Sequence, residues 1–591
     1  MRAKISVFIA MVLSITMCGC SVREGDNDVD NMELQGNSTG IVNPDNSEVS
    51  ETEDTQSVLE DYSTADGHIM NSKIIFAENT EAVQPYIDAA ELRKEQIRNS
   101  PTTIVKADEF LPGETYSGTA YYFSSVNGND NNDGLSPNAA FQTTSKYNQI
   151  RDSLQPGDAI FFERGSLFRL EDTDEYGGSG ITVMNGVTYS AYGEGAKPVL
   201  TKAIENSAYQ DAWELYYEGT DGAKIWKYHR EVQYCAGIVF DDTSYAIYVM
   251  EWPTPKGWMS VNMDLKDPAH GDVGAYPATN TTLTTTGEYL TVEDTLTEDL
   301  SFLTRLDLSG MEYPIDFNPG SIEGAWEVYG KPYMSYNGDL YLRCDAGNPG
   351  TIYKDIEIIA AAPDNDISIF DAWDAGGYVI DNLCIKYCYM PIGGTCRGEG
   401  VVIQNCEMGW QGNNLFKISS EELTTDYSLI GDGIYNISNN ALIQNNYLYQ
   451  MEEGVTFEQS EGSMEAMGNY RVTGNLIEYC GEGIRISWEE EAVFDKIELT
   501  DNMILYCGYG HNNNDFEGFF SIELGYIDCQ YAKEFLVRDN VLVGSKFALF
   551  SINDHLDAEI TDNVLVQGEE DSLMLKFVGY DAKWVMMNEL N

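Results

Sequence analysis

Three acidic residues recur at the same place in a short repeated pattern between residues 431 and 488. Asp432, Glu453 and Glu482 each precede a glycine, and each glycine opens a short run with alternating apolar residues. The three glycines are 21 and 29 residues apart in the chain. Most glycosidases cleave a glycosidic bond with a pair of carboxyl groups, one a proton donor and the other a nucleophile or base. The pattern predicts such a site, provided that the fold brings the acids together.

A repeat of this length is typical of a solenoid, in which each coil adds one short strand to each face. Equivalent residues of neighbouring coils lie about 4.8 Å apart, the spacing of hydrogen-bonded strands. Asp432, Glu453 and Glu482 would then form one column of carboxylates. A carboxylate separation of about 5 to 5.5 Å suits retaining glycosidases and about 6.5 to 9.5 Å suits inverting ones, so the column offers both by stacking. Crowded acids also raise one another's pKa, which favours a protonated donor.

Further residues near the column are candidates for supporting roles. Alternation from Val455 to Glu458 directs the Glu458 side chain outward, which makes it a reserve catalytic acid, and Glu523 is a weaker candidate. The candidate substrate-binding residues carry amide, guanidinium, indole or imidazole groups on either side of the column: Trp410, Gln411, Asn414, Arg485, Trp488 and His511. The competing interpretation is that an acid beside a glycine, and likewise His511, is a solvated turn residue.

A recurring asparagine supports the solenoid. Apolar residues follow an asparagine at seven positions: Asn382, Asn405, Asn446, Asn475, Asn502, Asn540 and Asn563. An asparagine at the corner of a coil can adopt the left-handed conformation, and it can stack its amide on the asparagine of the next coil. We therefore predict a ladder of asparagines through the coils between about residues 380 and 567.

The start of the folded region points to a known architecture. Residues 121–123 form a predicted strand, residues 127–137 a turn-rich loop, and Pro156-Gly157-Asp158 leads into a second strand. This order closely resembles the first coil of right-handed parallel β-helix proteins of the pectate-lyase-like superfamily. The resemblance implies an all-β solenoid and a carbohydrate-active protein, because the superfamily includes polysaccharide lyases, glycoside hydrolases, esterases and adhesins. A shared fold does not choose among these functions.

The first 20 residues have the features of an export signal. Arg2 and Lys4 precede an apolar run over residues 5–17 that is too short to span a bilayer. The following Gly19-Cys20 resembles the end of a bacterial lipoprotein signal, although Met17 replaces the usual leucine and Cys18 is atypical of the family. The resemblance implies cleavage before Cys20 and a lipid anchor on that cysteine, outside the cytoplasm at the cell membrane. The alternative is a secreted protein without an anchor.

Composition and repeat pattern divide the chain into six segments. We predict a lipoprotein signal peptide (1–20), a disordered acidic tether (21–80), a lead-in helix and linker (81–118), the first β-helix coils (119–204), a β-rich antiparallel insertion (205–355) and the main β-helix coils (356–591). Within the third segment, residues 86–98 have the pattern of an amphipathic helix.

Charge bears on the choice of partner. The chain has 34 lysines and arginines against 96 aspartates and glutamates, a formal net charge of −62. This balance excludes nucleic acid as a partner and favours a neutral polysaccharide or oligosaccharide over an anionic one. We expect a monomer that meets the membrane only through its lipid anchor.

The leading hypothesis is therefore a glycoside hydrolase that needs no cofactor. Its histidines and cysteines show no metal-ligand spacing, so no metal site is predicted. One alternative is a polysaccharide lyase, which would use calcium and an Arg or Lys base, with Arg397, Lys417, Arg471 and Arg485 as candidates. The other is a non-catalytic surface protein that binds glycans with exposed aromatic residues.

Overall fold

The computed structural model of the 591-residue chain describes most of the folded region. The described residues are 69–70, 72–102, 110–111, 116–170, 180–218, 224–232, 235–251, 258–264, 281–283, 289–291, 338–344, 347–360, 368–373, 375–394, 398–411, 416–418, 426–428, 432–435, 437, 440–459, 467–488, 494–508, 520–524, 534–545, 548–553, 559–568, 573–578 and 583–586.

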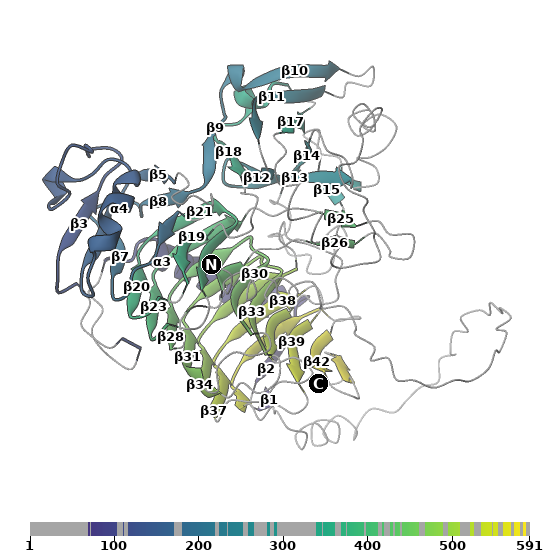
Figure 1. Ribbon diagram of the computed structural model, residues 1–591. Coiled ribbons are helices and arrows are strands. Elements are labelled where there is room, and N and C mark those ends of the chain that lie inside the picture. Colours follow the sequence, from purple (N-terminus) through teal and green to yellow (C-terminus); the bar gives the residue numbers. More distant parts are fainter. Residues whose placement is uncertain are drawn as a thin grey trace, which may run out of the picture.

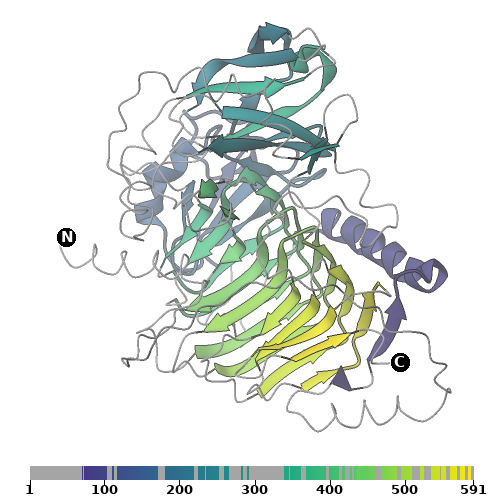
Figure 2. The ribbon, with the colours of Figure 1, turned by 90° about the vertical axis from the view of Figure 1, so that its right-hand side faces the viewer.

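Three long sheets, parallel except for one terminal strand pair, wrap around a common core (Figures 1 and 2). Sheet I contains, in spatial order, β1 (Ile69–Met70), β40 (Glu559–Thr561), β37 (Glu534–Arg538), β34 (Phe494–Thr500), β31 (Met467–Thr473), β28 (Ala441–Gln444), β23 (Val401–Gln404), β20 (Tyr378–Asp381), β7 (Thr188–Tyr192), β4 (Ala159–Glu163) and β3 (Ala120–Phe123).

Sheet II contains β2 (Lys73–Phe76), β41 (Val564–Gln567), β38 (Val541–Ser545), β35 (Met503–Cys507), β32 (Leu476–Glu478), β29 (Tyr447–Tyr449), β24 (Glu407–Gln411), β21 (Cys384–Cys388), β8 (Val199–Thr201) and β5 (Leu167–Arg169). Sheet III contains β43 (Lys583–Met586), β42 (Leu573–Val578), β39 (Ala548–Asn553), β36 (Phe520–Leu524), β33 (Glu482–Trp488), β30 (Glu453–Gln459), β27 (Asp432–Tyr435), β22 (Met390–Gly394), β19 (Ser368–Ala372) and β6 (Ile181–Thr182). Because the chain visits the three sheets in turn, each coil stacks on the previous one, and the predicted right-handed parallel β-helix is confirmed.

The core is built from equivalent apolar residues of successive coils. In sheet III, one column of paired residues runs through Ile434, Val455, Ile484, Ile522 and Phe550, and each is 0% exposed. Burying one such side chain stabilises the fold by about 1.5–3 kcal/mol. Since residues between these inward positions face out, the same strands present polar side chains to the solvent side of the sheet.

The predicted asparagine ladder exists over its C-terminal part. Asn446, Asn475, Asn502, Asn540 and Asn563 are all 0% exposed, and the side-chain amide of each of the first four donates to Oδ1 of the next at 3.0–3.1 Å. Each Oδ1 also accepts the backbone N–H of the preceding asparagine. The ladder therefore links the coils at the corner between sheets I and II.

Asn382 and Asn405 do not belong to the stacked position. They occupy the preceding position of the corner, where the backbone is left-handed, with φ of 53–68° at residues 382, 405, 445, 474, 501, 539 and 562. The residue that aligns with the stacked asparagines is Cys406, whose backbone N–H donates to Oδ1 of Asn446 at 3.0 Å. The left-handed backbone and the stacked amide, both expected of a single asparagine, thus belong to two neighbouring residues.

The N-terminal segment joins the last coil of the solenoid. Residues 69–76, which the sequence analysis placed in the tether, form β1 and β2, and these pair in parallel with β40 and β41. Between them Ser72 accepts the backbone N–H of Asn563 at 3.2 Å, so Ser72 terminates the asparagine ladder. Residues that come first in the described chain therefore complete its C-terminal end.

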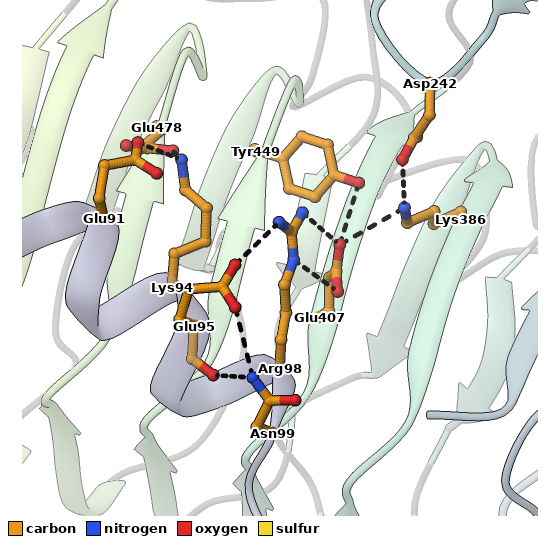
Figure 3. A network of polar contacts seen from close by, with 10 residues as sticks. All are labelled: Glu91, Lys94, Glu95, Arg98, Asn99, Asp242, Lys386, Glu407, Tyr449 and Glu478. Carbon is orange, nitrogen blue, oxygen red and sulfur yellow. Dashed lines mark hydrogen bonds and ion pairs between the residues drawn. The ribbon is translucent and has the colours of Figure 1, made fainter. Parts of the chain in front are cut away.

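Helix α3 (Thr80–Arg98) then runs along the outer face of sheet II (Figures 2 and 3). It begins earlier than the predicted residue 86, because Asn79 caps its N-terminus by accepting the N–H of Ala82. Ala90 and Ile97 of the helix pack in an apolar cluster with side chains of sheet II. Ion pairs also hold it there: Lys94 Nζ lies 2.8 Å from Oε2 of Glu478, and Arg98 Nη2 lies 2.9 Å from Oε1 of Glu407.

A mainly antiparallel sheet interrupts the coils, close to the predicted insertion. Its strands are β9 (Ala203–Asn206), β10 (Trp213–Glu218), β11 (Lys224–Val232), β12 (Cys235–Phe240), β13 (Ser244–Glu251), β14 (Trp258–Asp264), β17 (Gly338–Arg343) and β18 (Ile356–Ala360). The hairpin of β25 (Phe416–Ile418) and β26 (Asp426–Ser428) joins it through β13, and β15 (Thr281–Leu283) and β16 (Tyr289–Thr291) pair with each other.

Short helices complete the described secondary structure. They are η1 (Pro137–Ala139), α4 (Ser145–Ile150), η2 (Arg151–Ser153), η3 (Gln210–Ala212) and α8 (Pro349–Ile352). Among the described residues, no helix has both the length and the hydropathy required to cross a membrane.

The ion-pair network in Figure 3 connects the insertion to the β-helix. Lys386 of β21 lies 2.8 Å from Oδ2 of Asp242, in the turn between β12 and β13, and 3.4 Å from Oε1 of Glu407. Since Glu407 also pairs with Arg98, one buried carboxylate contacts cations from both the helix and sheet II. Although burial opposes ionisation, Lys386 and Arg98 hold the pKa of Glu407 below its usual value.

Candidate active site

The three acids of the repeated pattern stack in register on sheet III. Asp432 of β27 is the Cα partner of Glu453 in β30, which in turn is the partner of Glu482 in β33. The predicted column of carboxyl-bearing residues is therefore present, with one acid on each of three consecutive coils. We call Asp432, Glu453 and Glu482 the acid column.

The glycine after each acid is required by close packing at the corner. A Cβ on Gly454 would lie 2.6 Å from the carbonyl oxygen of Gly483 and 3.0 Å from Cγ2 of Ile477. A Cβ on Gly483 would lie 2.4 Å from the carbonyl oxygen of Ser521. Both positions thus face the next coil and the core, so neither tolerates a side chain.

Glu453 is fixed by two contacts. Its Oε1 lies 2.6 Å from Nη1 of Arg485, and its Oε2 accepts the hydroxyl of Thr456 at 2.5 Å. The Glu453 residue is 6% exposed. Charge-assisted hydrogen bonds of this kind are strong and fix the orientation of a carboxylate. Glu453 is thus an ion-paired carboxylate with both oxygens engaged.

Arg485 lies between two carboxylates. It stacks in register between Thr456 of β30 and Glu523 of β36. Besides the contact with Glu453, its Nε lies 3.1 Å from Oε2 of Glu523, and the Arg485 and Glu523 side chains are each 15% exposed. The Arg485 guanidinium therefore contacts a carboxylate from each of the two neighbouring coils.

Glu482 differs from Glu453 in its surroundings. The residue is partly exposed, but its Oε2 is buried and has no hydrogen-bond partner in the part of the chain that the structure describes. Burial, and then the negative charge of Glu523, hold the pKa of Glu482 well above its usual range; Arg485 opposes this shift and Glu453 adds to it. Of the column, Glu482 is therefore the carboxyl group whose surroundings most oppose ionisation.

Asp432 is positioned through the backbone by Gln411. The amide nitrogen Nε2 of Gln411 donates to the carbonyl oxygen of Asp432 at 2.9 Å, and its Oε1 accepts the N–H of Glu452 at 3.1 Å. Gln411 is 1% exposed, whereas Asp432 is partly exposed. The amide thus connects the backbones of Asp432 and Glu452, which belong to neighbouring coils.

The other predicted substrate-binding residues are spread more widely. Trp410 is 3% exposed and packs in the apolar cluster on sheet II, with its ring centroid 6.1 Å from that of Tyr449. The backbones of Glu458 and Trp488 belong to β30 and β33, and their side chains lie outside what the structure describes. Asn414 and His511, like Cys20, also lie outside the described residues.

Sequence reasoning missed the role of two residues. Thr456 was not singled out, and Glu523 was rated below the acid column. A signal for both was present, because Thr456, Arg485 and Glu523 each follow their coil's corner at the same strand position and pair in register. Within the described residues, no group of three or more His, Cys, Asp or Glu side chains has a geometry that could hold a metal ion.

Comparisons with known proteins give one curated relative over a short stretch. No protein-family model matches the chain. A stretch of 113 residues, 18% of the chain, is 38% identical to the lacto-N-biosidase of Bifidobacterium longum subsp. longum. The match spans 7% of the length of that protein.

Solved structures with similar folds are distant. XylC in complex with xylose aligns over 76% of this chain and 63% of its own chain, with 11% identity and a TM-score of 0.33. The GH136 lacto-N-biosidase from Eubacterium ramulus aligns over 78% and 68%, with 11% identity and a TM-score of 0.29. An exopolygalacturonase from Thermotoga maritima aligns over 84% and 98%, with 10% identity and a TM-score of 0.23.

Proposed function

We propose that this protein is a glycoside hydrolase whose catalytic groups belong to the acid column. One observation carries the proposal: two carboxyl groups stacked one coil apart have different partners. Glu453 is ion-paired with Arg485, whereas Glu482 has a buried oxygen without a partner, and burial holds its pKa well above the usual range. A pair of neighbouring carboxyl groups in unlike environments is the arrangement that acid catalysis on a glycosidic bond requires.

In the proposed reaction Glu482 is the general acid. Its proton passes to the glycosidic oxygen as the bond from that oxygen to the anomeric carbon breaks, and the leaving sugar departs as an alcohol. The Glu453 carboxylate attacks the anomeric carbon to form a glycosyl ester. Water then hydrolyses this ester, with Glu482 as base recovering a proton. Neighbouring coils are spaced by about 4.8 Å, which favours this retaining mechanism over inversion.

Asp432 has a supporting role in this proposal. It lies one coil before Glu453 and is partly exposed, so it is placed to accept a hydroxyl of the sugar bound beside the scissile bond. Hydrogen bonds from sugar hydroxyls to a carboxylate strengthen in the transition state when they oppose developing positive charge. Because several acids surround the site and the chain has a net charge of −62, we propose a neutral polysaccharide or oligosaccharide as substrate.

The arginines weigh against the lyase alternative. Arg485 contacts the carboxylates of Glu453 and Glu523, so its guanidinium is held in two ion pairs and is not free to approach a substrate proton. Arg471 lies 2.5 Å from Oε2 of Glu498, with its guanidinium 5.2 Å from the ring centroid of Phe110. Arg397 and the Lys417 side chain lie outside what the structure describes. The lacto-N-biosidase relative also supports a hydrolase.

We further propose that the protein acts outside the cytoplasm as a monomer, held at the membrane by a lipid on Cys20. The alternative function is glycan binding without catalysis, and the experiment must distinguish it from hydrolysis. No cofactor takes part in the proposed mechanism.

The test compares Glu482→Gln and Glu453→Gln on glycosides with poor and good leaving groups. Wild-type protein is first screened on neutral and uronic polysaccharides for reducing ends and for ultraviolet absorbance from unsaturated uronides. Loss of a general acid should lower kcat by about 10²- to 10⁴-fold for a sugar leaving group but far less for dinitrophenol, which needs no proton. Loss of the nucleophile should lower both.

Glu559→Gln is the matched control, because Glu559 is an exposed acid on sheet I. It should retain wild-type activity on every substrate. Unsaturated products from the wild type, or full activity on all substrates in both column variants, would contradict the proposal. Retained glycan binding with no product from any substrate would assign the protein to the binding class.

A further inference from the structure

We propose that Arg485 and Glu523 are positioning residues that decide which acid of the column carries the proton. The inference deepens the proposed function and rests on it for its catalytic meaning, but the protonation itself can be measured without substrate. Arg485 was predicted from sequence to bind substrate. The structure instead places its guanidinium between carboxylates of two coils.

The geometry divides the guanidinium between two partners. Nη1 of Arg485 lies 2.6 Å from Glu453 Oε1, and Nε lies 3.1 Å from Glu523 Oε2. Exposure of the Glu453, Arg485 and Glu523 side chains is 8%, 15% and 15%, so water screens these contacts weakly. The contact with Glu453 is the shorter, and Thr456 reinforces it by donating to the other oxygen.

Glu482 is the third carboxyl group of this cluster. Of the three, it makes the fewest described contacts with the Arg485 guanidinium. It stands three residues before Arg485 on β33, beside Glu453 of the preceding coil and close to Glu523 of the next. Three ionised carboxylates beside one cation would leave a net charge of −2 in a poorly solvated site. Retaining one proton reduces that charge to −1, and Glu482 is the member of the three for which the described contacts include no ion pair with Arg485.

The charged and titratable groups that face Glu482 come from four strands. Glu523 belongs to β36, Arg485 to β33 itself, Glu453 to β30, and the buried thiol of Cys507 to β35. Of the carboxylates, Glu523 has the larger effect in retaining the proton on Glu482, and Arg485 acts in the opposite direction. Removing Glu523 or Arg485 should therefore move the protonation of Glu482 in opposite directions.

The experiment follows the carbonyl stretch of the protonated carboxyl group by infrared difference spectroscopy as pH is varied. The Glu482 band is identified by its absence in Glu482→Gln. Glu523→Gln should lower the midpoint of its titration by about one pH unit, and Arg485→Met should raise it by about one unit, the usual effect of a neighbouring charge. Arg485→Lys keeps the positive charge and should restore most of the wild-type midpoint.

Arg471→Met is the matched control, because Arg471 also pairs with a glutamate, Glu498, but on sheet I. It should leave the Glu482 midpoint unchanged. In active protein, the alkaline limb of the kcat/KM profile should move with the band, down in Glu523→Gln and up in Arg485→Met. A change confined to folding would lower activity without these opposite shifts.

The proposal is overturned if neutral-pH protein lacks a protonated band that Glu482→Gln removes. It is equally overturned if that band titrates at one pH in the wild type, Glu523→Gln and Arg485→Met. The expected shifts in a protein that hydrolyses no glycan would support the inference and refute the proposed function. Hydrolysis that depends on Glu482, with no shift of the titration in either variant, would support the proposed function and refute the inference.

Discussion

Replacing Asn502 by alanine should strongly destabilise the β-helix. Asn502 is 0% exposed, and its side chain makes four hydrogen bonds. Its Oδ1 accepts the backbone N–H and the Nδ2 amide of Asn475 at 3.1 and 3.0 Å. Its Nδ2 donates to Oδ1 of Asn540 at 3.0 Å and to the carbonyl oxygen of Val472 at 2.9 Å. Alanine removes all four contacts from a site closed to water.

The magnitude follows from the groups left behind. Oδ1 of Asn540 keeps the bond from the backbone N–H of residue 502, so it is not orphaned. Asn475 loses the acceptor of its backbone N–H and of one amide hydrogen. A buried donor without a partner costs about 1–3 kcal/mol, so these two donors predict a loss of about 2–6 kcal/mol. We expect a value near the middle, about 4 kcal/mol.

Urea unfolding followed by circular dichroism measures this loss, with Asn138→Ala as the control. Asn138 is an exposed asparagine in η1, and its replacement should change stability by less than about 0.5 kcal/mol. Asn502→Asp provides a second test, because an ionised carboxylate would oppose Oδ1 of Asn540 and the Val472 carbonyl. Burial raises the folded pKa of that aspartate above its unfolded value, so the penalty should shrink as pH falls and the acid regains a donor.

A loss of less than about 1 kcal/mol in Asn502→Ala would contradict this expectation, because the stacked amides would then contribute no more than an ordinary surface contact. The expectation also fails if Asn502→Asp is equally destabilised at neutral and acidic pH. In either case the ladder would be a consequence of coil stacking and not one of its causes.

Two other predictions concern the helix and the corner glycines. Arg98→Met should cost about 1–2 kcal/mol, below the range for a fully buried pair, because Arg98 is 36% exposed and Lys386 remains 3.4 Å from Glu407. The pKa of Glu407 is lower in the folded protein than in the unfolded chain, where it is near 4.5. The difference in unfolding free energy between wild type and Arg98→Met should therefore be fully present above pH 4.5 and disappear as the pH falls through the folded pKa. A difference in urea unfolding that does not change with pH would contradict this prediction. Gly454→Ala should destabilise by about 1–3 kcal/mol and lower kcat, because its Cβ would lie 2.6 Å from the Gly483 carbonyl oxygen. An increase in Tm would show instead that the neighbouring coil yields and that the reduced entropy of the unfolded chain dominates.

The solenoid was predictable because its signals are local and repeated. The acid–glycine spacing predicted a column that the strand register confirms for Asp432, Glu453 and Glu482. What periodicity could not provide was the unequal environment of these acids, since it depends on Arg485 and Glu523 meeting across coils whose connecting segments differ in length. Likewise, the sequence does not distinguish the asparagines with a left-handed backbone from those whose amides stack.

The docking of the N-terminal segment was also beyond sequence reasoning. Residues 69–76 are short, and they follow a long acidic region, so nothing local distinguishes them from the tether. Their partners are β40 and β41, at the other end of the chain. A pairing over that distance leaves no periodic trace. Composition therefore extended the predicted tether to residue 80, although β1 begins at Ile69.

The pairing of β1 and β2 with the last coil sets the order in which the chain can be completed. Ser72 contacts Asn563, a residue 491 positions later, so the first described segment leaves the ribosome long before its partner exists. A chain truncated before residue 559 would offer β1 and β2 no strands to pair with and would leave Ile75, 5% exposed in the finished protein, in water. Contacts of such sequence separation form late, because the chain entropy of closing the loop opposes them. Closure of this end thus requires that synthesis has passed β41, and we expect molecules that lack β40 and β41 to remain sensitive to proteolysis at β1 and β2.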